Sequence, residues 1–105
     1  MERNLGIWSL KNQELVDLLI SRAGGRTTVK IIDEILENPQ NANQLSKNLK
    51  LNYKTIIHHT KIMQEHNYIT KNTFKKTYYY HPTEKLIKNL DEYYYIKKEL
   101  EKRER

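Results

Sequence analysis

The sequence predicts a mainly α-helical fold that carries one small β-hairpin, and three observations support this. Apolar residues recur at helical spacing over most of the chain. Two short runs rich in tyrosine and β-branched residues lie within residues 68–80, as expected for paired strands. The 105 residues include 3 glycines and 2 prolines, which is typical of regular structure with few loops. A chain of this length forms one small domain.

The N-terminal part contains two predicted helices separated by a glycine pair. The first covers residues 12–23 and ends at Gly24-Gly25, because glycine readily adopts the left-handed backbone of a helix C-terminus. We expect Thr27 or Thr28 to cap the second helix. Asn38-Pro39 should end it, since the residue before a proline disfavours helical geometry.

Two more helices, joined by a tight turn, are predicted next. Asn43 is expected to cap a short helix, and Lys50-Leu51 forms the turn. The small Ser46 lets the two helices approach each other. Asn52 then caps a longer helix that runs to about His66.

A hairpin and a last helix complete the chain. Strands are predicted at residues 68–71 and 77–80, with Lys75 and Lys76 near the tip. Thr83 should cap a helix over residues 84–105. This order of elements is the layout of a winged helix-turn-helix. It divides the chain into an N-terminal extension (1–25), a winged helix-turn-helix (26–83) and a C-terminal helix (84–105).

Positive charge is concentrated in one half of the chain. Residues 41–90 carry nine lysines and two glutamates, a balance of +7, while the whole chain has a net charge of +6. Such segregation is typical of a face that binds a polyanion. A lysine-rich surface that merely keeps the protein soluble is the alternative.

The helix after Asn52 separates into two faces. Ile56, Thr60 and Met63 share the side expected to pack inward. The other side combines cationic, hydrogen-bonding and apolar groups suited to a major groove: Tyr53, Lys54, Ile57, His58 and Lys61. An exposed Ile57 could meet a thymine methyl group. Alternatively, the helix is rotated and Ile57 is buried.

Residues 45–63, followed by Asn67-Tyr68-Ile69, resemble the DNA-binding segment of the ArsR-type transcriptional regulators, a family with many archaeal members. Asn52 stands at the family's serine, Ile56 at its valine and His58-His59 at its histidine pair. Lys61 matches the family's lysine, and the match extends over about residues 27–85. The resemblance implies a winged helix-turn-helix that regulates transcription by binding double-stranded DNA.

Specific contacts follow from this resemblance. It implies base contacts from four residues of the recognition helix, namely Tyr53, Lys54, Ile57 and His58. It implies contacts with the sugar-phosphate backbone from Lys47, Asn52, Lys61, Lys71, Lys75 and Lys76. Phosphate neutralisation by the lysines would supply most of the affinity and make it depend on salt.

The sequence also departs from the family. Lys50 replaces the turn glycine, and a left-handed backbone there would cost about 1 kcal/mol, so we expect a differently built turn. Thr28 replaces a common arginine. With 0 cysteines the family's thiolate metal sensing cannot operate.

The terminal helix carries an apolar stripe that indicates a partner helix, most simply that of a second copy. We therefore expect a homodimer whose interface consists of Leu15, Leu19, Leu86, Leu90, Tyr93, Ile96 and Leu100. The alternative is a helix that folds back on its own domain.

Other functional classes lack their signatures. No catalytic triad order or phosphate-binding glycine loop occurs, so we expect no enzyme. The four histidines are badly spaced for a zinc site, and we expect no metal or cofactor. No apolar run approaches the ~20 residues of a membrane span, and we expect a cytoplasmic protein. Two alternatives remain: a winged-helix adaptor between proteins, and a subunit that binds RNA or single strands through its tyrosines.

Overall fold

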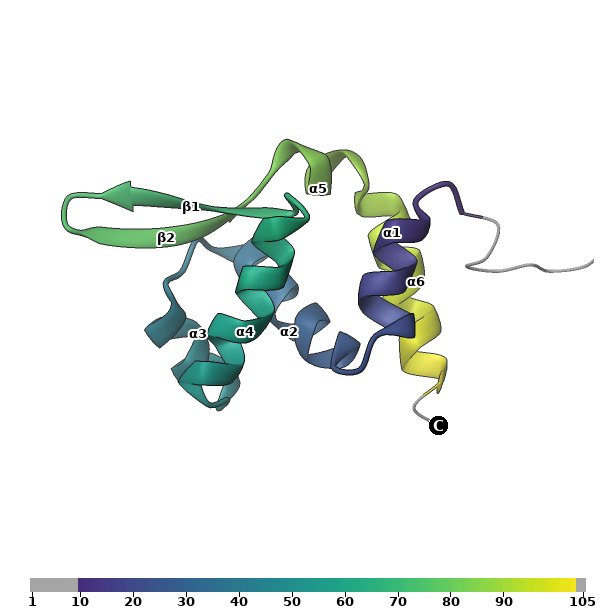
Figure 1. Ribbon diagram of the computed structural model, residues 1–105, viewed down its shortest axis with the longest axis horizontal. Coiled ribbons are helices and arrows are strands. Elements are labelled where there is room, and N and C mark those ends of the chain that lie inside the picture. The colour runs from purple at the N-terminus through teal and green to yellow at the C-terminus, as the bar shows by residue number, and fades with distance from the viewer. Residues whose placement is uncertain (1–9, 104–105) are drawn as a thin grey trace, which may run out of the picture.

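The structure is a computed structural model that describes residues 10–103, and it confirms a helical protein with one antiparallel hairpin. Its elements, in chain order, are α1 (Gln13–Val16), the π-helical turn η2 (Asp17–Ser21), α2 (Gly25–Glu37), α3 (Ala42–Leu49), α4 (Tyr53–Glu65), β1 (Ile69–Phe74), β2 (Thr77–Pro82), α5 (Glu84–Lys88) and α6 (Leu90–Arg103). The hairpin projects from one end of the molecule, and α1, η2 and α6 lie together at the other (Figure 1). Among the described residues, no helix is long and apolar enough to cross a membrane.

The predicted helix over residues 12–23 is shorter and less regular than expected. Asn12 caps it, because its side-chain oxygen accepts from the backbone N–H of Leu15 at 3.0 Å. After four α-helical residues the chain continues as the wider π-helical turn and leaves the helix at Ser21. The first nine residues of the predicted N-terminal extension lie outside the described part of the chain.

The start of α2 corrects the expected cap at Thr27 or Thr28. The helix begins at Gly25, after Gly24 in the left-handed conformation (φ 87°). Here the backbone passes so close to η2 that a Cβ atom on Gly25 would lie 1.8 Å from the carbonyl oxygen of Leu19. The glycine pair thus permits a close crossing of two backbones, and both threonines fall inside the helix.

The helix-turn-helix has the predicted order with one different cap. Asn41, not Asn43, caps α3, because Asn41 and Gln44 exchange hydrogen bonds between their side chains and backbones at 2.8 and 2.9 Å. Lys50 adopts the left-handed conformation (φ 56°) that we expected lysine to avoid. A hydrogen bond from the Ser46 hydroxyl to the Leu51 carbonyl oxygen (2.6 Å) stabilises the corner.

The hairpin is longer than predicted, and the last helix is broken. The first strand of the hairpin extends to Phe74 and the second begins at Thr77, so that Lys75-Lys76 alone form the tip. Thr83 caps α5 as predicted, since its hydroxyl accepts from the N–H of Leu86 at 3.2 Å. The helix then breaks at Asn89 and continues as α6.

The C-terminal helix packs back on its own chain, which corrects the expected dimer stripe. It lies against η2 and α2, and its apolar side chains join one continuous core. Of the seven residues expected at a dimer interface, six are buried within the single chain and one, Leu90, is half-buried; the six are Leu15, Leu19, Leu86, Tyr93, Ile96 and Leu100. The stripe was misread because sequence periodicity shows that a face is covered without showing what covers it.

Candidate nucleic-acid interface

Helix α4 is held in place by its buried side. Ile56, Thr60 and Met63 are buried as predicted, at 0%, 1% and 0% exposure. Asn52 begins the helix, and its side-chain oxygen accepts from the N–H of Lys54 at 2.7 Å. The Thr60 hydroxyl lies 3.3 Å from that of the buried Tyr80 on β2, so α4 and the hairpin share one core.

The opposite side of α4 faces solvent. Tyr53, Lys54, His58 and Lys61 are exposed. The sequence left open whether Ile57 is exposed or buried. In the structure it is half-buried and packs against the edge of the core. The helix therefore presents a phenol, two ammonium groups and an imidazole to whatever approaches it.

The hairpin lies beside this exposed side. In its register Lys71 pairs with Tyr80, and Asn72 pairs with Tyr79. Tyr80 is buried, and Tyr78 packs edge-on against it with ring centroids 5.5 Å apart. Tyr78 and Tyr80 therefore pack between the hairpin and the core. The ammonium group of Lys71 lies 4.5 Å from the ring centroid of Tyr78.

A contact that the sequence did not reveal connects α4 to the hairpin. The phenol groups of Tyr53 and Tyr78 share a hydrogen bond, which raises the pKa of Tyr53. Alternation in the strand predicts which face Tyr78 occupies, but the partner depends on how the hairpin leans over the helix.

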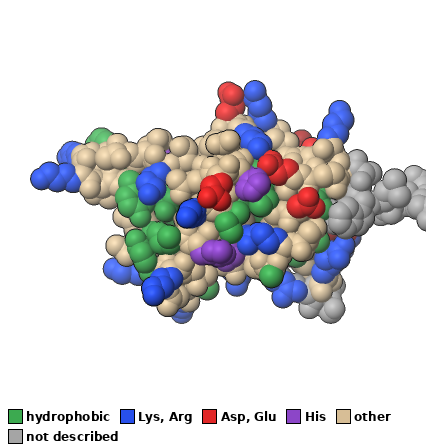
Figure 2. Space-filling model, viewed as in Figure 1, with side chains coloured by type: hydrophobic (Ala, Val, Ile, Leu, Met, Phe, Trp, Pro, Cys, Tyr) green, Lys and Arg blue, Asp and Glu red, His purple; other side chains and the backbone are tan. Residues whose placement is uncertain are grey.

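The remaining predicted backbone ligands are also exposed. Lys47 lies on α3 and Lys75 and Lys76 at the hairpin tip. Glu65 at the end of α4 is the only acidic residue of α3, α4 and the hairpin, so these elements are strongly basic. In Figure 2 the acidic side chains lie over the centre and the α1 end, and the hairpin tip carries basic ones. We call α4, α3 and the hairpin with these lysines the basic face.

Behind the basic face lies a buried polar cluster, which sequence reasoning missed. His59 on α4 is 7% exposed, and its Nδ1 lies 3.0 Å from the Thr28 hydroxyl and 3.4 Å from Nη2 of Arg22. A guanidinium group only donates, so a hydrogen bond from Arg22 requires Nδ1 to be the ring nitrogen without a proton. Burial, then Arg22 and His58, lower the pKa of His59 and keep it neutral. The pair His58-His59 was the only feature of the sequence that pointed to this cluster.

A second polar cluster, around Glu14, fastens α1 to the winged helix. The Glu14 carboxylate accepts from Nζ of Lys85 at 2.8 Å and from the Tyr68 hydroxyl at 2.9 Å. Its other oxygen lies 2.8 Å from Nδ1 of His66. Led by Lys85, these contacts lower the pKa of Glu14 to about 2.

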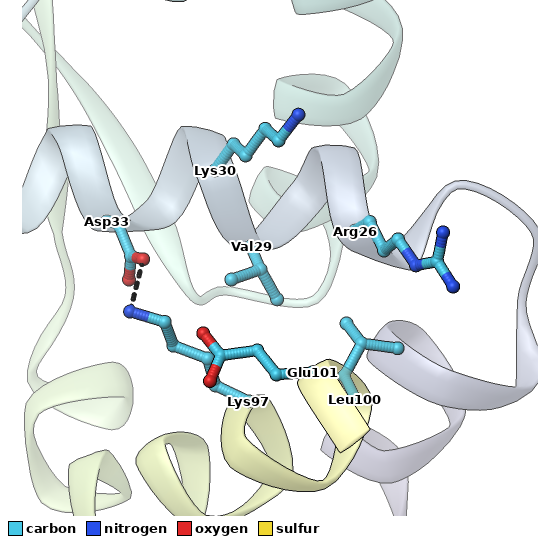
Figure 3. Close-up of a pocket in the computed structure, with 7 residues that line it drawn as sticks. All are labelled: Arg26, Val29, Lys30, Asp33, Lys97, Leu100 and Glu101. Carbon is cyan, nitrogen blue, oxygen red and sulfur yellow. Dashed lines mark ion pairs between the residues drawn. The ribbon is translucent and has the colours of Figure 1, made fainter. Parts of the chain in front are cut away.

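One hollow lies on the side away from the basic face, between α2 and α6 (Figure 3). It has a volume of about 320 Å³, and Asp33 and Lys97 on its rim form an ion pair. Asp33 accepts from the buried Tyr93 hydroxyl at 2.7 Å and from Nζ of Lys97 at 2.7 Å. These bonds stabilise the α2–α6 contact, and Asp33 raises the pKa of Lys97. Among residues 10–103, no group of three histidine or acidic side chains could hold a metal ion.

Comparisons with known proteins agree with this architecture. Residues 26–71, which contain α2, α3 and α4, match the family described as bacterial regulatory protein, arsR family. HlyU from Vibrio cholerae has a similar fold, with a TM-score of 0.57 and 15% identity over 77% of this chain and 89% of that one. No match was found among curated proteins. The observed helices, turn and hairpin form a winged helix-turn-helix, and residues 26–71 of it match the helix-turn-helix model of the ArsR family.

Proposed function

We propose that this protein is a sequence-specific regulator of transcription that binds double-stranded DNA through the basic face. In this proposal α4 enters the major groove, and the hairpin lies on the flanking DNA. The observation that carries the proposal is the exposed side of α4, where Lys54, His58 and Lys61 face solvent and the only acidic residue of the helix is Glu65 at its end. Residues 26–83 form the DNA-binding part, and residues 10–25 with 84–103 support it.

The exposed groups differ in the part of the DNA that we expect them to contact. Tyr53, Lys54 and His58 lie on the groove-facing side of α4, where hydrogen-bonding groups distinguish base pairs. The half-buried Ile57 leaves part of its side chain for a thymine methyl group. We propose that six exposed residues contact the sugar-phosphate backbone of DNA: Lys47, Asn52, Lys61, Lys71, Lys75 and Lys76.

The proposal includes a homodimer. One recognition helix reads one half-site, and two copies would place their helices in successive major grooves about 34 Å apart. Since the predicted apolar stripe is buried within each chain, the contact between copies must use another surface. Ile87 on α5 and Tyr94 on α6 remain 48% and 50% exposed and supply an apolar area for it. Light scattering after gel filtration tests this: Tyr94→Glu should shift the mass from two chains to one.

The DNA-binding proposal is tested by selecting ligands from random duplexes, followed by fluorescence anisotropy over a salt series. We expect one selected sequence with an inverted repeat and an affinity that falls steeply with salt. Lys76→Ala should weaken binding to selected and unrelated duplexes alike, whereas Lys54→Ala and His58→Ala should weaken the selected duplex more.

The same measurements distinguish the alternatives. Tighter binding to single strands than to duplex would favour the hypothesis that the protein binds RNA or single-stranded DNA. Failure to bind any nucleic acid, with a correctly folded chain, would refute the proposal and leave the protein adaptor. Equal losses for Lys54→Ala on all duplexes would refute the assignment of α4 to base reading.

A further inference from the structure

The tip of the hairpin carries an aromatic ring that the basic face does not explain. Phe74 is 65% exposed, the most exposed of the large apolar side chains in the described part of the chain. It is the last residue of β1 and pairs with Thr77 across the two-residue tip. Burying a phenylalanine ring is worth about 2 kcal/mol, a gain that this ring does not make within its own chain.

The tip itself is not built for hairpin stability. Two-residue hairpin loops favour glycine and asparagine, which tolerate a positive φ. Here Lys75 adopts φ 58°, a conformation that disfavours residues with a Cβ atom. The chain thus places one of the two tip lysines, Lys75, in a strained conformation, and strain of this kind is found where a ligand binds.

The surroundings of Phe74 identify the chemistry of that ligand. The hairpin, residues 69–82, carries three lysines and no acidic residue. The ammonium group of Lys75 lies 5.6 Å from the centroid of the Phe74 ring, so the apolar and cationic groups are presented together. A surface that presents an aromatic ring beside a positive charge is complementary to stacked bases next to phosphates.

We propose that Phe74 is a wedge that enters the minor groove beside the site read by α4 and partly unstacks one base step. This inference rests on the proposed function. The minor groove is about 6 Å wide, which admits the tip of a hairpin but not a helix. Lys75 and Lys76 contact the phosphates on its walls while the ring reaches the base edges. Proteins that insert apolar side chains in this way kink the duplex, and pyrimidine–purine steps open most readily.

The wedge gives the protein specificity at positions that α4 does not reach. Because TA and CA steps unstack more readily than others, sequences with such a step under the hairpin tip should bind more tightly. The selected duplexes should therefore share a pyrimidine–purine step on each flank, outside the major-groove half-site.

The test uses the full chain and the selected duplex with 2-aminopurine placed in turn at each flanking position. The fluorescence of this base rises when it is unstacked. We expect the wild-type complex to raise emission at one flanking step and to bend the duplex, as measured by energy transfer between its ends. Phe74→Ala should lose both effects, and Phe74→Leu should keep part of them.

Two matched variants serve as controls. Thr77→Ala alters the residue directly opposite Phe74 and should leave emission and bend unchanged. Lys76→Ala should reduce affinity and salt dependence while saturated complexes keep the emission rise. All these side chains are exposed, so thermal unfolding should be the same for each variant.

The outcomes separate the two proposals. A wild-type chain that binds the duplex without an emission rise at any flanking step overturns the wedge and leaves the regulator proposal standing. The wedge is also overturned if Phe74→Ala keeps the rise. If the wild-type chain binds no duplex, both proposals fail.

Discussion

The hydrogen bond between Tyr93 and Asp33 allows a quantitative test of how α6 is held on the domain. Tyr93 is fully buried, and its hydroxyl lies 2.7 Å from the carboxylate of Asp33 and 3.2 Å from the carbonyl oxygen of Val29. Burial and the neighbouring carboxylate raise the pKa of Tyr93, so the phenol is a neutral donor. The variant Tyr93→Phe removes this donor and little else.

The expected loss follows from the type of bond. A hydrogen bond to a charged group contributes about 1.5–3 kcal/mol. The value here should lie near the lower limit, because Asp33 is 32% exposed and keeps its ion pair with Lys97. We therefore expect Tyr93→Phe to reduce the free energy of unfolding by about 1.5 kcal/mol. With an m value of about 1.5 kcal/mol/M, the urea midpoint should fall by about 1 M.

Urea unfolding followed by circular dichroism measures this shift, and the neighbouring Tyr94 provides the control. Tyr94→Phe removes the same atom from a side chain that is 50% exposed and should leave the midpoint within error. A double-mutant cycle with Asp33→Asn isolates the contribution of the pair. Equal midpoints for the two phenylalanine variants would show that the bond does not stabilise α6 and would refute the reasoning.

Three further predictions concern stability. Because the pKa of His59 is lowered in the folded chain, the unfolded chain binds more protons near and below pH 6.5, and the stability should fall as the pH drops from there. His59→Gln should remove this loss of stability, and His58→Gln should keep it. Urea midpoints at several pH values would show the difference. Because the pKa of Glu14 falls from 4.5 to about 2, its contribution is complete above pH 4.5 and disappears as the pH falls to about 2. Glu14→Gln should therefore be less stable than wild type at pH 6 and equally stable near pH 2, and a gap that persists at low pH would contradict this. Gly25→Ala should cost about 3 kcal/mol or more, since its Cβ would lie 1.8 Å from the carbonyl oxygen of Leu19, and an unchanged melting temperature would disprove the close crossing.

Local signals in the sequence predicted the parts of the fold that depend on neighbours along the chain. Asn52 and Thr83 cap their helices as expected, because a cap is a contact between residues two or three positions apart. The inward side of α4 followed from helical periodicity in the same way. Lys50 shows the limit of such rules, since the corner stabilised by Ser46 overrides its intrinsic preference.

Contacts between distant segments could not be predicted. The apolar stripe of the last helix was assigned to a second chain, although η2 and α2 cover it within the same one. The helix that we expected over residues 12–23 continues as a π-helical turn, and the Leu19 carbonyl of this turn lies against Gly25. His59 was left without a role, since its partners Thr28 and Arg22 are 31 and 37 positions away. These features depend on tertiary packing, which composition and spacing do not encode locally.

The bond between the phenols of Tyr53 and Tyr78 restricts what the free protein can recognise. A phenol has one O–H group, so a hydrogen bond between two phenols leaves the pair with one O–H free to donate, where two separate tyrosines would have two. The exposed side of α4 therefore offers a ligand fewer donors at Tyr53 and Tyr78 than its sequence suggests.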